Sequence, residues 1–188
     1  ASLPMTILDR DRAGLPVSID EPEYPVINEI IARAHRICAD MNTGYCPPDR
    51  VRSLFAELTE TEPDETLRIC PPLHVGFGKN LRVGKNVFFN TGCTIMDRGG
   101  VTIGDDTFLG PNVSLITTNH GLAPSERRST VSKPIVLGKN VWIGAGAVVL
   151  PGVTIGDNSV VGAGAVVTRN IPANTVAAGN PACVLRSL

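Results

Sequence analysis

Two different hydrophobic patterns divide the chain near residue 70. Residues 25–42 and 49–60 place their apolar side chains three and four positions apart, which predicts two amphipathic helices. Pro25 suits the start of the first helix, Gly44 follows its end, and Asp49 is a candidate N-cap of the second. Because two short helices cannot bury both apolar faces by themselves, we expect them to lie against the rest of the chain.

From residue 77 the chain follows a six-residue repeat. An aliphatic or aromatic residue heads each unit and is often followed by glycine, as in VGKNVF, IGDDTF and IGAGAV. A helix cannot keep this period, because six is not a multiple of 3.6 residues. A short extended segment followed by a tight turn can keep a period of six residues. The heads of the units stand at positions 77, 83, 89, 95, 103, 109, 115, 137, 143, 149, 155, 161 and 167.

Three such units close one triangular coil of about 18 residues, and successive coils stack as parallel strands about 4.8 Å apart. The heads then point inward, while Gly, Asn and Asp at the corners accept left-handed backbone conformations. The repeats predict about four to five coils. The sequence therefore predicts a mainly β protein with a parallel β-helix at residues 71–188. This domain includes a loop at 117–135 and a C-terminal tail, and a helical module at 1–70 precedes it.

Composition narrows the function classes. Lys and Arg number 17 against 18 Asp and Glu, and this balance argues against a general binder of nucleic acid or anionic membranes. No apolar run approaches the roughly 20 residues of a membrane helix, and the first residues resemble no secretory signal. The five cysteines form no CxxC motif and no pairing framework, which is typical of a reducing compartment. We therefore expect a cytoplasmic protein.

The six-residue repeat is interrupted once, by the segment TTNHGLAPSERRSTVSKP at residues 117–134. A flat coil offers no pocket, whereas a long excursion can enclose one. Loops of this length in a compact domain are usually functional or disordered. His120 stands at the edge of the interruption, and from the residues alone a catalytic and a structural role are equally open.

Four segments together resemble the hexapeptide-repeat acyltransferases, and within them the maltose/galactoside O-acetyltransferase group. The resemblance covers nearly the whole chain and implies that the β-helix is left-handed and that the helical module is of the maltose-acetyltransferase type. The segments are NVFFNTGCTIMDRGGVTIGDDTFLGPNVSL (86–115), TTNHGLAPSERR (117–128), KPIVLGKNVWIGAGAVVLPGVTIGDNSVVGAGAVVT (133–168) and IPANTVAAGNPACVLR (171–186).

This resemblance implies an acetyl-CoA-dependent O-acetyltransferase. His120 would act as the general base that takes the proton of an acceptor hydroxyl as its oxygen attacks the thioester directly, without an acyl-enzyme. The acceptor would be a small hydroxylated compound, a sugar or sugar-like molecule. The resemblance also implies a homotrimer with active sites between subunits, acetyl-CoA as co-substrate and no metal requirement.

On the acceptor side, the resemblance assigns Asn90 to the pocket and Asp97 to an acceptor hydroxyl or to orientation of the base. Arg98 follows where galactoside-type enzymes carry a second acidic residue, and Gly76 replaces a common polar residue. Whether Arg98 or Asp20 contacts the acceptor stays open. These departures leave the identity of the acceptor undetermined.

On the donor side, the resemblance places a groove for CoA along the late coils. A backbone N–H near Ala145 would stabilise the oxyanion, and basic residues would hold the phosphates. Two departures stand out, Gly121 where proline is usual and Cys183 where arginine is frequent. The matched positions are Trp142, Ala145, Gly162, Ala163, Thr168, Arg169 and Arg186.

Three other functions are known or conceivable for a six-residue repeat of this kind, and the residues bear on each of them. A γ-class carbonic anhydrase needs three metal-binding histidines on adjacent coils, and the chain has only His35, His74 and His120 at unsuitable spacings. A xenobiotic acetyltransferase of the streptogramin or chloramphenicol type shares the donor and the base but differs in its N-terminal architecture. A non-catalytic β-helix scaffold would need neither His120 nor CoA. For His35 and His74 the residues favour surface or packing roles.

Overall fold

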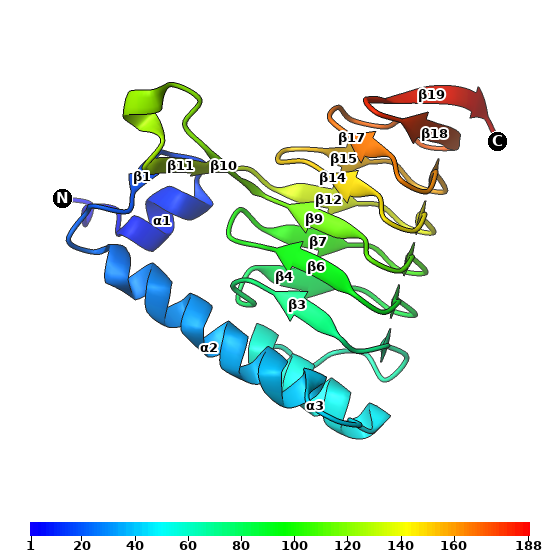
Figure 1. Cartoon of the computed structure of the whole chain (residues 1–188), viewed down its shortest axis with the longest axis horizontal. Helices are drawn as coiled ribbons and strands as arrows, with labels where there is room; N and C mark the ends of the chain where they lie inside the picture. The colour runs from blue at the N-terminus through cyan, green and yellow to red at the C-terminus, as the bar shows by residue number, and fades with distance from the viewer.

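The computed structural model describes residues 1–188 and shows a parallel β-helix with helices at one end and a β-hairpin at the other (Figure 1). The helices are α1 (Ile7–Arg12), α2 (Tyr24–Asn42), α3 (Pro48–Thr59) and the 3₁₀ turn η1 (Pro124–Glu126). The two helices that the sequence predicts are therefore confirmed as α2 and α3. Asp49 is not the N-cap that we expected: Pro47 occupies that position, and Asp49 pairs with Arg52 inside the first turn of α3.

Three flat faces make up the β-helix, and all neighbouring strands within the coils are parallel. The first face contains β2 (Arg68–Ile69), β5 (Phe88–Phe89), β8 (Phe108–Leu109), β13 (Trp142–Ile143), β16 (Val160–Val161) and β18 (Thr175–Gly179). The second face contains β3 (Leu73–Val75), β6 (Cys93–Met96), β9 (Ser114–Ile116), β14 (Val148–Val149) and β17 (Val166–Val167). The third face contains β4 (Leu81–Val83), β7 (Val101–Ile103), β12 (Ile135–Leu137) and β15 (Thr154–Ile155).

The predicted stacking of repeat heads is confirmed over most of the chain. Ile95 lies in register with Leu115, and Ile143 with Val161, all four fully or almost fully buried. Phe77 is the exception, because it packs with Ile7 and Ile27 of the N-terminal module in a separate apolar cluster. The β-helix also starts earlier than the repeat, at β2. Its first coil carries the turn Cys70-Pro71-Pro72 in place of a glycine-headed unit, so the six-residue pattern did not reveal it.

Asparagines at one corner of the coils support the tight turns. Asn140, Asn158 and Asn174 all have positive φ, which asparagine tolerates better than most residues. Their side chains also form a ladder: Asn140 Nδ2 donates to Asn158 Oδ1 at 3.0 Å, and Asn158 Nδ2 donates to Asn174 Oδ1 at 2.7 Å. The corner thus combines a backbone preference with hydrogen bonds from coil to coil.

Replacing Asn158 by alanine is expected to lower the free energy of unfolding by about 1–2 kcal/mol, because alanine is strained at positive φ. Urea denaturation followed by circular dichroism measures the change. Asn158→Gly is the matched control, since glycine accepts this backbone conformation and loses only the ladder contacts. Equal losses in the two variants would show that backbone strain is not the dominant effect.

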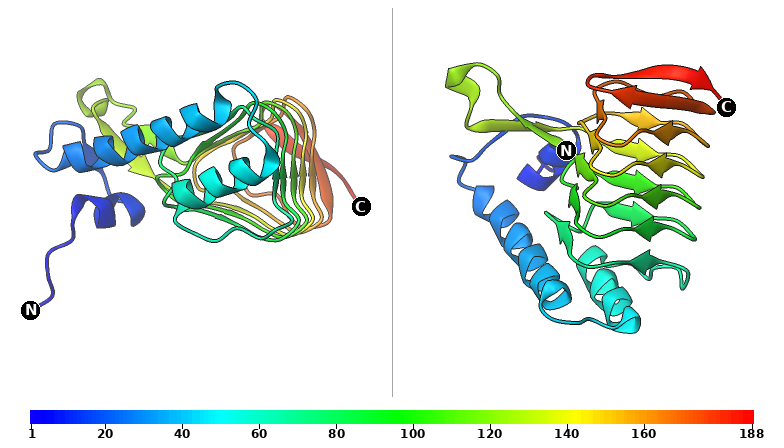
Figure 2. Two further views of the ribbon diagram at one scale, coloured as in Figure 1. Left: turned by 90° about the horizontal axis from the view of Figure 1, so that it is seen from below. Right: turned by 45° about the vertical axis from the view of Figure 1, so that its right-hand side comes forward.

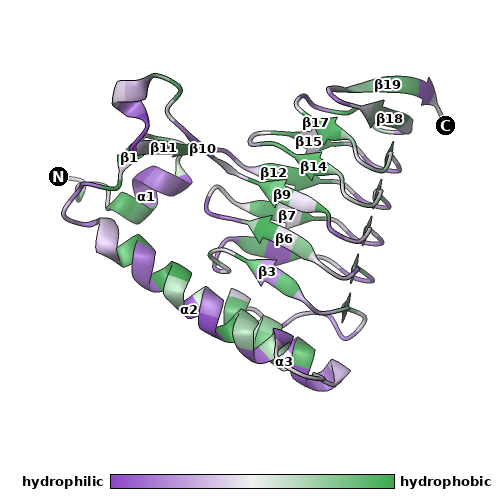
Figure 3. Ribbon diagram, viewed as in Figure 1, coloured by the Kyte–Doolittle hydropathy of each residue, from purple (hydrophilic) through white to green (hydrophobic).

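The helices close one end of the β-helix and the C-terminal strands close the other (Figure 2). Phe55 of α3 packs against Phe89 of the second coil, with ring centroids 6.2 Å apart. At the far end, β19 (Ala182–Ser187) pairs antiparallel with β18. Figure 3 shows α2 and α3 alternating between hydrophobic and hydrophilic residues, as helices with one buried side do. None of the helices combines the length and hydrophobicity that crossing a bilayer requires.

The interruption of the repeat folds as a β-hairpin and not as an irregular loop. Strands β10 (Thr118–His120) and β11 (Ser129–Ser132) pair antiparallel, with His120 opposite Thr130. A short N-terminal strand, β1 (Val17–Ser18), adds to the free side of β11. The N-terminal segment therefore packs on the element that carries His120, an arrangement that the hydrophobic pattern did not predict.

Candidate active site

His120 lies at the end of β10 with an exposed side chain whose orientation is set by one hydrogen bond. Its Nδ1 lies 2.9 Å from the carbonyl oxygen of Arg127. Because a carbonyl can only accept, Nδ1 must carry the proton, and in the neutral imidazole the lone pair is then on Nε2. His120 is thereby held in the tautomer that a general base needs.

The tip of the hairpin is closed by the residues that hold His120. Arg127 donates from Nε to the Gly121 carbonyl at 3.0 Å and from Nη2 to the Leu122 carbonyl at 3.1 Å. The Gly121 N–H donates to the Ser129 carbonyl at 2.9 Å. A Cβ at position 121 would lie 2.4 Å from the backbone oxygen of Glu126. Glycine at this position therefore permits a tight tip.

Gly121→Pro is expected to lower kcat by about 10- to 100-fold, because it removes the N–H that bonds Ser129 and forces the tip away from Glu126, displacing the base. Steady-state acetyl transfer measures the loss, and the melting temperature reports the fold. Leu122→Ala is the matched control, since this side chain is exposed at the same tip. Wild-type kcat in Gly121→Pro would show that the tip does not position His120.

A cavity of about 240 Å³ opens beside His120, between α2, the second face and the hairpin. It includes His35 of α2, for which the residues favoured a surface or packing role. His35 stands one helical turn after Ile31, which lines the same cavity, and this spacing was the available signal. His74 lines only the neighbouring hollow. The lining residues are Ile31, His35, Gly76, Met96, Asp97, Arg98, Ile116, Thr118 and His120.

Asp97 belongs to the wall of this cavity but its side chain is fully buried. Oδ1 accepts from the N–H groups of Phe77 and Gly78 at 3.0 and 2.9 Å, and Oδ2 accepts from that of Asn80 at 3.1 Å. Burial raises the pKa of this carboxyl, and the three N–H groups oppose that rise. In this chain Asp97 thus holds the turn at 77–80 in place, and its contact with an acceptor or with His120 stays a prediction.

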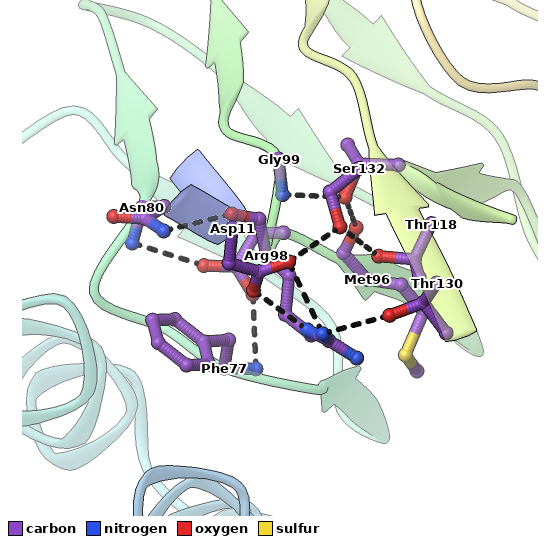
Figure 4. Close-up of polar contacts among 11 residues, drawn as sticks. Asp11, Phe77, Asn80, Met96, Arg98, Gly99, Thr118, Thr130 and Ser132 are labelled. Atoms are coloured by element: carbon purple, nitrogen blue, oxygen red, sulfur yellow. Dashed lines mark hydrogen bonds and ion pairs between the residues drawn. The ribbon is translucent and has the colours of Figure 1, made fainter. Parts of the chain in front are cut away.

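A buried polar cluster lies behind the hairpin (Figure 4). Arg98 donates from Nε to Asp11 Oδ2 at 2.9 Å, and from Nη2 to Asp11 Oδ1 and to Thr130 Oγ1, both at 3.1 Å. Ser132 Oγ donates to Asp11 Oδ1 at 3.1 Å and lies 2.7 Å from Thr118 Oγ1. The cluster joins α1, the second coil and both strands of the hairpin.

Asp20 takes part in a second, exposed link between the N-terminal segment and the hairpin. Its two oxygens accept from Arg128 Nε and Nη2 at 2.8 and 2.7 Å. The Arg128 guanidinium lowers the pKa of the Asp20 carboxyl. Asp20 does not line the cavity beside His120, so in this chain its partner is a cation of the hairpin.

A second group of predicted residues, one from the acceptor side and two from the donor side, lies at the opposite edge of the second face, where strands of the first face turn into it. Asn90, Trp142 and Ala145 line a separate hollow of about 340 Å³. Ala145 and Ala163 are exposed residues, and their N–H groups have no backbone partner. They stand on successive coils, so they form a short column of free donors at this corner.

Glycines at the same corner are needed for close stacking of the coils. A Cβ at Gly144 would lie 2.6 Å from the Ala163 nitrogen, and one at Gly110 would lie 2.8 Å from the Ala145 nitrogen. Gly162 is similarly close to Ala178. Glycine at these positions thus allows the coils to approach without a clash between a Cβ and the next coil.

The remaining predicted residues lie apart from both the cavity beside His120 and the hollow lined by Asn90, Trp142 and Ala145. Thr168 and Arg169 are exposed where β17 ends, and Arg186 is exposed on β19. Within one chain, therefore, the structure brings His120 and Asp97 together around one cavity and Asn90, Trp142 and Ala145 around another. The two groups flank opposite edges of the second face.

The side chains of this chain assemble no metal-binding cluster, and its cysteines are unpaired. No three His, Cys, Asp or Glu side chains gather in a way that could hold a metal ion. All five cysteines are free thiols. Burial raises the pKa of the Cys93 thiol to about 11 and also raises that of Cys38, so neither is a thiolate at neutral pH.

Comparison with known proteins gives matches along most of the chain. Residues 134–169 match the family model described as bacterial transferase hexapeptide (six repeats), and residues 80–116 match that of the hexapeptide repeat of succinyl-transferase. Galactoside O-acetyltransferase of Escherichia coli is 39% identical over 177 residues, which cover 83% of this chain and 87% of that protein. The chain spans about two thirds of the length of the first curated relatives that it matches.

Solved structures agree over nearly the full length. A maltose O-acetyltransferase from Clostridium difficile 630 has a TM-score of 0.91 and 30% identity, and the match covers 98% of both chains. A hexapeptide-repeat acetyltransferase from Vibrio cholerae, complexed with acetyl coenzyme A, has a TM-score of 0.83 and 32% identity over 98% of this chain and 99% of that one.

Proposed function

Because this chain belongs to the hexapeptide-repeat acetyltransferases of the galactoside and maltose O-acetyltransferase group, we propose that it transfers an acetyl group from acetyl-CoA to a hydroxyl of a sugar or sugar-like acceptor. The observation that carries the proposal is the hydrogen bond from His120 Nδ1 to the Arg127 carbonyl, beside a cavity of about 240 Å³. It leaves the Nε2 lone pair free to act as a base.

His120 is proposed to take the acceptor hydroxyl proton on Nε2 as the oxygen forms its bond to the acetyl carbon. The carbon–sulfur bond then breaks, and His120 returns the proton to the departing CoA sulfur. A positioned base supplies about 10²- to 10⁴-fold of rate. The free N–H of Ala145 is the proposed donor to the tetrahedral oxyanion, a contribution of comparable size.

The remaining donor contacts are also proposed from the family. The corner column with Ala145, Gly162 and Ala163 would receive the pantetheine arm, with Trp142 and Thr168 beside it. Arg169 and Arg186 are exposed cations of the kind that bind phosphates. On the acceptor side, Asn90 can both donate to and accept from a hydroxyl.

We propose a homotrimer in which the hairpin of one subunit faces the Asn90–Ala145 hollow of the next. Two observations support it. The predicted site residues of one chain lie at opposite edges of the second face, so a complete site needs a second copy. The hollow also exposes Trp142 and Phe108, with relative exposures of 56% and 42%, side by side on neighbouring strands, and contiguous exposed apolar side chains are typical of an interaction surface. A cytoplasmic location is proposed from the five free thiols.

The test is an acceptor panel in which the thiol of released CoA is detected, run with sugars, glycosides and streptogramin- and chloramphenicol-like drugs. Turnover with a sugar and sedimentation as a trimer are expected. Turnover with the drugs alone would replace the proposal by the xenobiotic alternative. If the protein neither binds CoA nor transfers an acetyl group to any acceptor, the non-catalytic β-helix scaffold is the remaining alternative.

A further inference from the structure

Most polar side-chain groups that line the cavity beside His120 are already hydrogen-bonded within the protein. Asp97 is fully buried, and both of its oxygens accept backbone N–H groups. Thr118 Oγ1 is bonded to the Ser132 hydroxyl, and His120 Nδ1 to the Arg127 carbonyl. What remains free is the imidazole of His35, Nε2 of His120 and part of Arg98.

Arg98 is held rigidly, with one nitrogen unused. Nε and Nη2 bind Asp11 and Thr130, and the side chain has only 13% relative exposure. Nη1 has no partner, and Figure 4 draws it without a dashed line. No buried side-chain nitrogen or oxygen of the protein lacks a partner, so Nη1 must reach solvent-accessible space. Arg98 lines this cavity, and Nη1 is the one nitrogen of its side chain that a ligand there could still bond.

We propose that Arg98 determines acceptor specificity and that the acceptor is a sugar acid, which places a carboxylate on Nη1 and a hydroxyl at His120. This proposal rests on the proposed acetyl transfer. A neutral sugar hydroxyl both donates and accepts, and because Asp97 is taken up by backbone N–H groups, only neutral acceptors such as the two imidazoles remain here to receive its proton. A carboxylate only accepts, and its hydrogen bonds to a guanidinium are charge-assisted, about twice as strong as neutral ones.

The ion pair with Asp11 favours this role. Asp11 occupies the Nε–Nη2 edge and has only 3% side-chain exposure, so the guanidinium is fixed before a ligand arrives. Little side-chain entropy is then lost on binding. The ring of Tyr24 lies 5.9 Å from Arg98 Cζ and limits movement further.

The test measures kcat and KM for matched acceptors, galacturonate against galactose and methyl glucuronide against methyl glucoside. The wild-type protein should show a kcat/KM at least about tenfold higher for each acid. The variant Arg98→Gln/Asp11→Asn removes both charges together, so that neither is left unpaired. It should lower the ratio of kcat/KM for the acid to kcat/KM for the matched neutral sugar by about 10- to 100-fold, chiefly through the KM of the acid, and any loosening of the hairpin should lower kcat for both acceptors alike.

Arg128→Gln is the matched control, because it removes an exposed guanidinium from the same hairpin and should leave the preference unchanged. A wild-type preference for neutral sugars, or a preference for acids that the double variant retains, overturns the specificity proposal while acetyl transfer stands. Absence of CoA release with every acceptor overturns the proposed function itself. Retained melting temperature and trimer mass in the double variant exclude misfolding as the cause of an effect.

Discussion

Replacing His120 by alanine is expected to lower kcat by about 10²- to 10⁴-fold with little change in stability or CoA affinity. The side chain is exposed on the hairpin, so its removal leaves no core cavity. Its one hydrogen bond, from Nδ1 to the Arg127 carbonyl, orients the ring and lies at the surface. The variant therefore loses the base and keeps the fold. Steady-state CoA release, calorimetric CoA binding and thermal melting measure the three quantities.

His74→Ala is the matched control for this loss. His74 is an exposed histidine on β3 of the second face, outside the cavity beside His120, so its removal should leave kcat within about twofold of wild type. Turnover that survives His120→Ala would rule out the proposed base. A comparable loss of kcat in both variants would show that the effect is not specific to His120.

Replacing Asp11 by alanine is expected to lower the free energy of unfolding by about 3–5 kcal/mol, because the nearly buried Arg98 is left without its partner. Asp11 also accepts from Ser132 of the hairpin, and Arg98 donates to Thr130, which stands opposite His120. The same variant should therefore reduce turnover by loosening the strand that carries the base. Chemical denaturation and kcat measured below the unfolding transition test the two effects.

Asp20→Ala provides the comparison, because it removes the exposed ion pair with Arg128 that ties the same two segments. Exposed pairs contribute about 0–1 kcal/mol, so this variant should stay close to wild type. Equal destabilisation by Asp11→Ala and Asp20→Ala would contradict the importance of burial. Unchanged stability in Asp11→Ala would mean that Arg98 finds another partner.

Periodicity alone predicted most of the coiled domain. Heads such as Ile95 and Val161 recur every six residues and are fully buried, as a coil built from three six-residue units predicts. The prediction was wrong where the six-residue repeat is interrupted and where a repeat position packs against another part of the chain. Phe77 continues the repeat but packs against the N-terminal module, and β2, the first strand of the first coil, was missed because prolines follow it in place of a glycine-headed unit.

The candidate site was only partly accessible to the same reasoning. His120 stood out because it interrupts the repeat, and the backbone donors near Ala145 followed from the family's pattern. His35 and Asp11 did not stand out. His35 reaches the cavity through the packing of α2 on the second face, and Asp11 meets Arg98 across 87 residues of sequence.

The amino-acid sequence by itself determined the six-residue repeat of the β-helix and the two amphipathic helices, because each depends on spacings between near neighbours. Only the tertiary structure decided that the interruption is a hairpin backed by α1, that Asp11 and Arg98 form a buried pair, and that the site residues of one chain lie on two edges. These features depend on contacts between distant segments. The free energy of such contacts comes from burial and charge pairing, which no local pattern records.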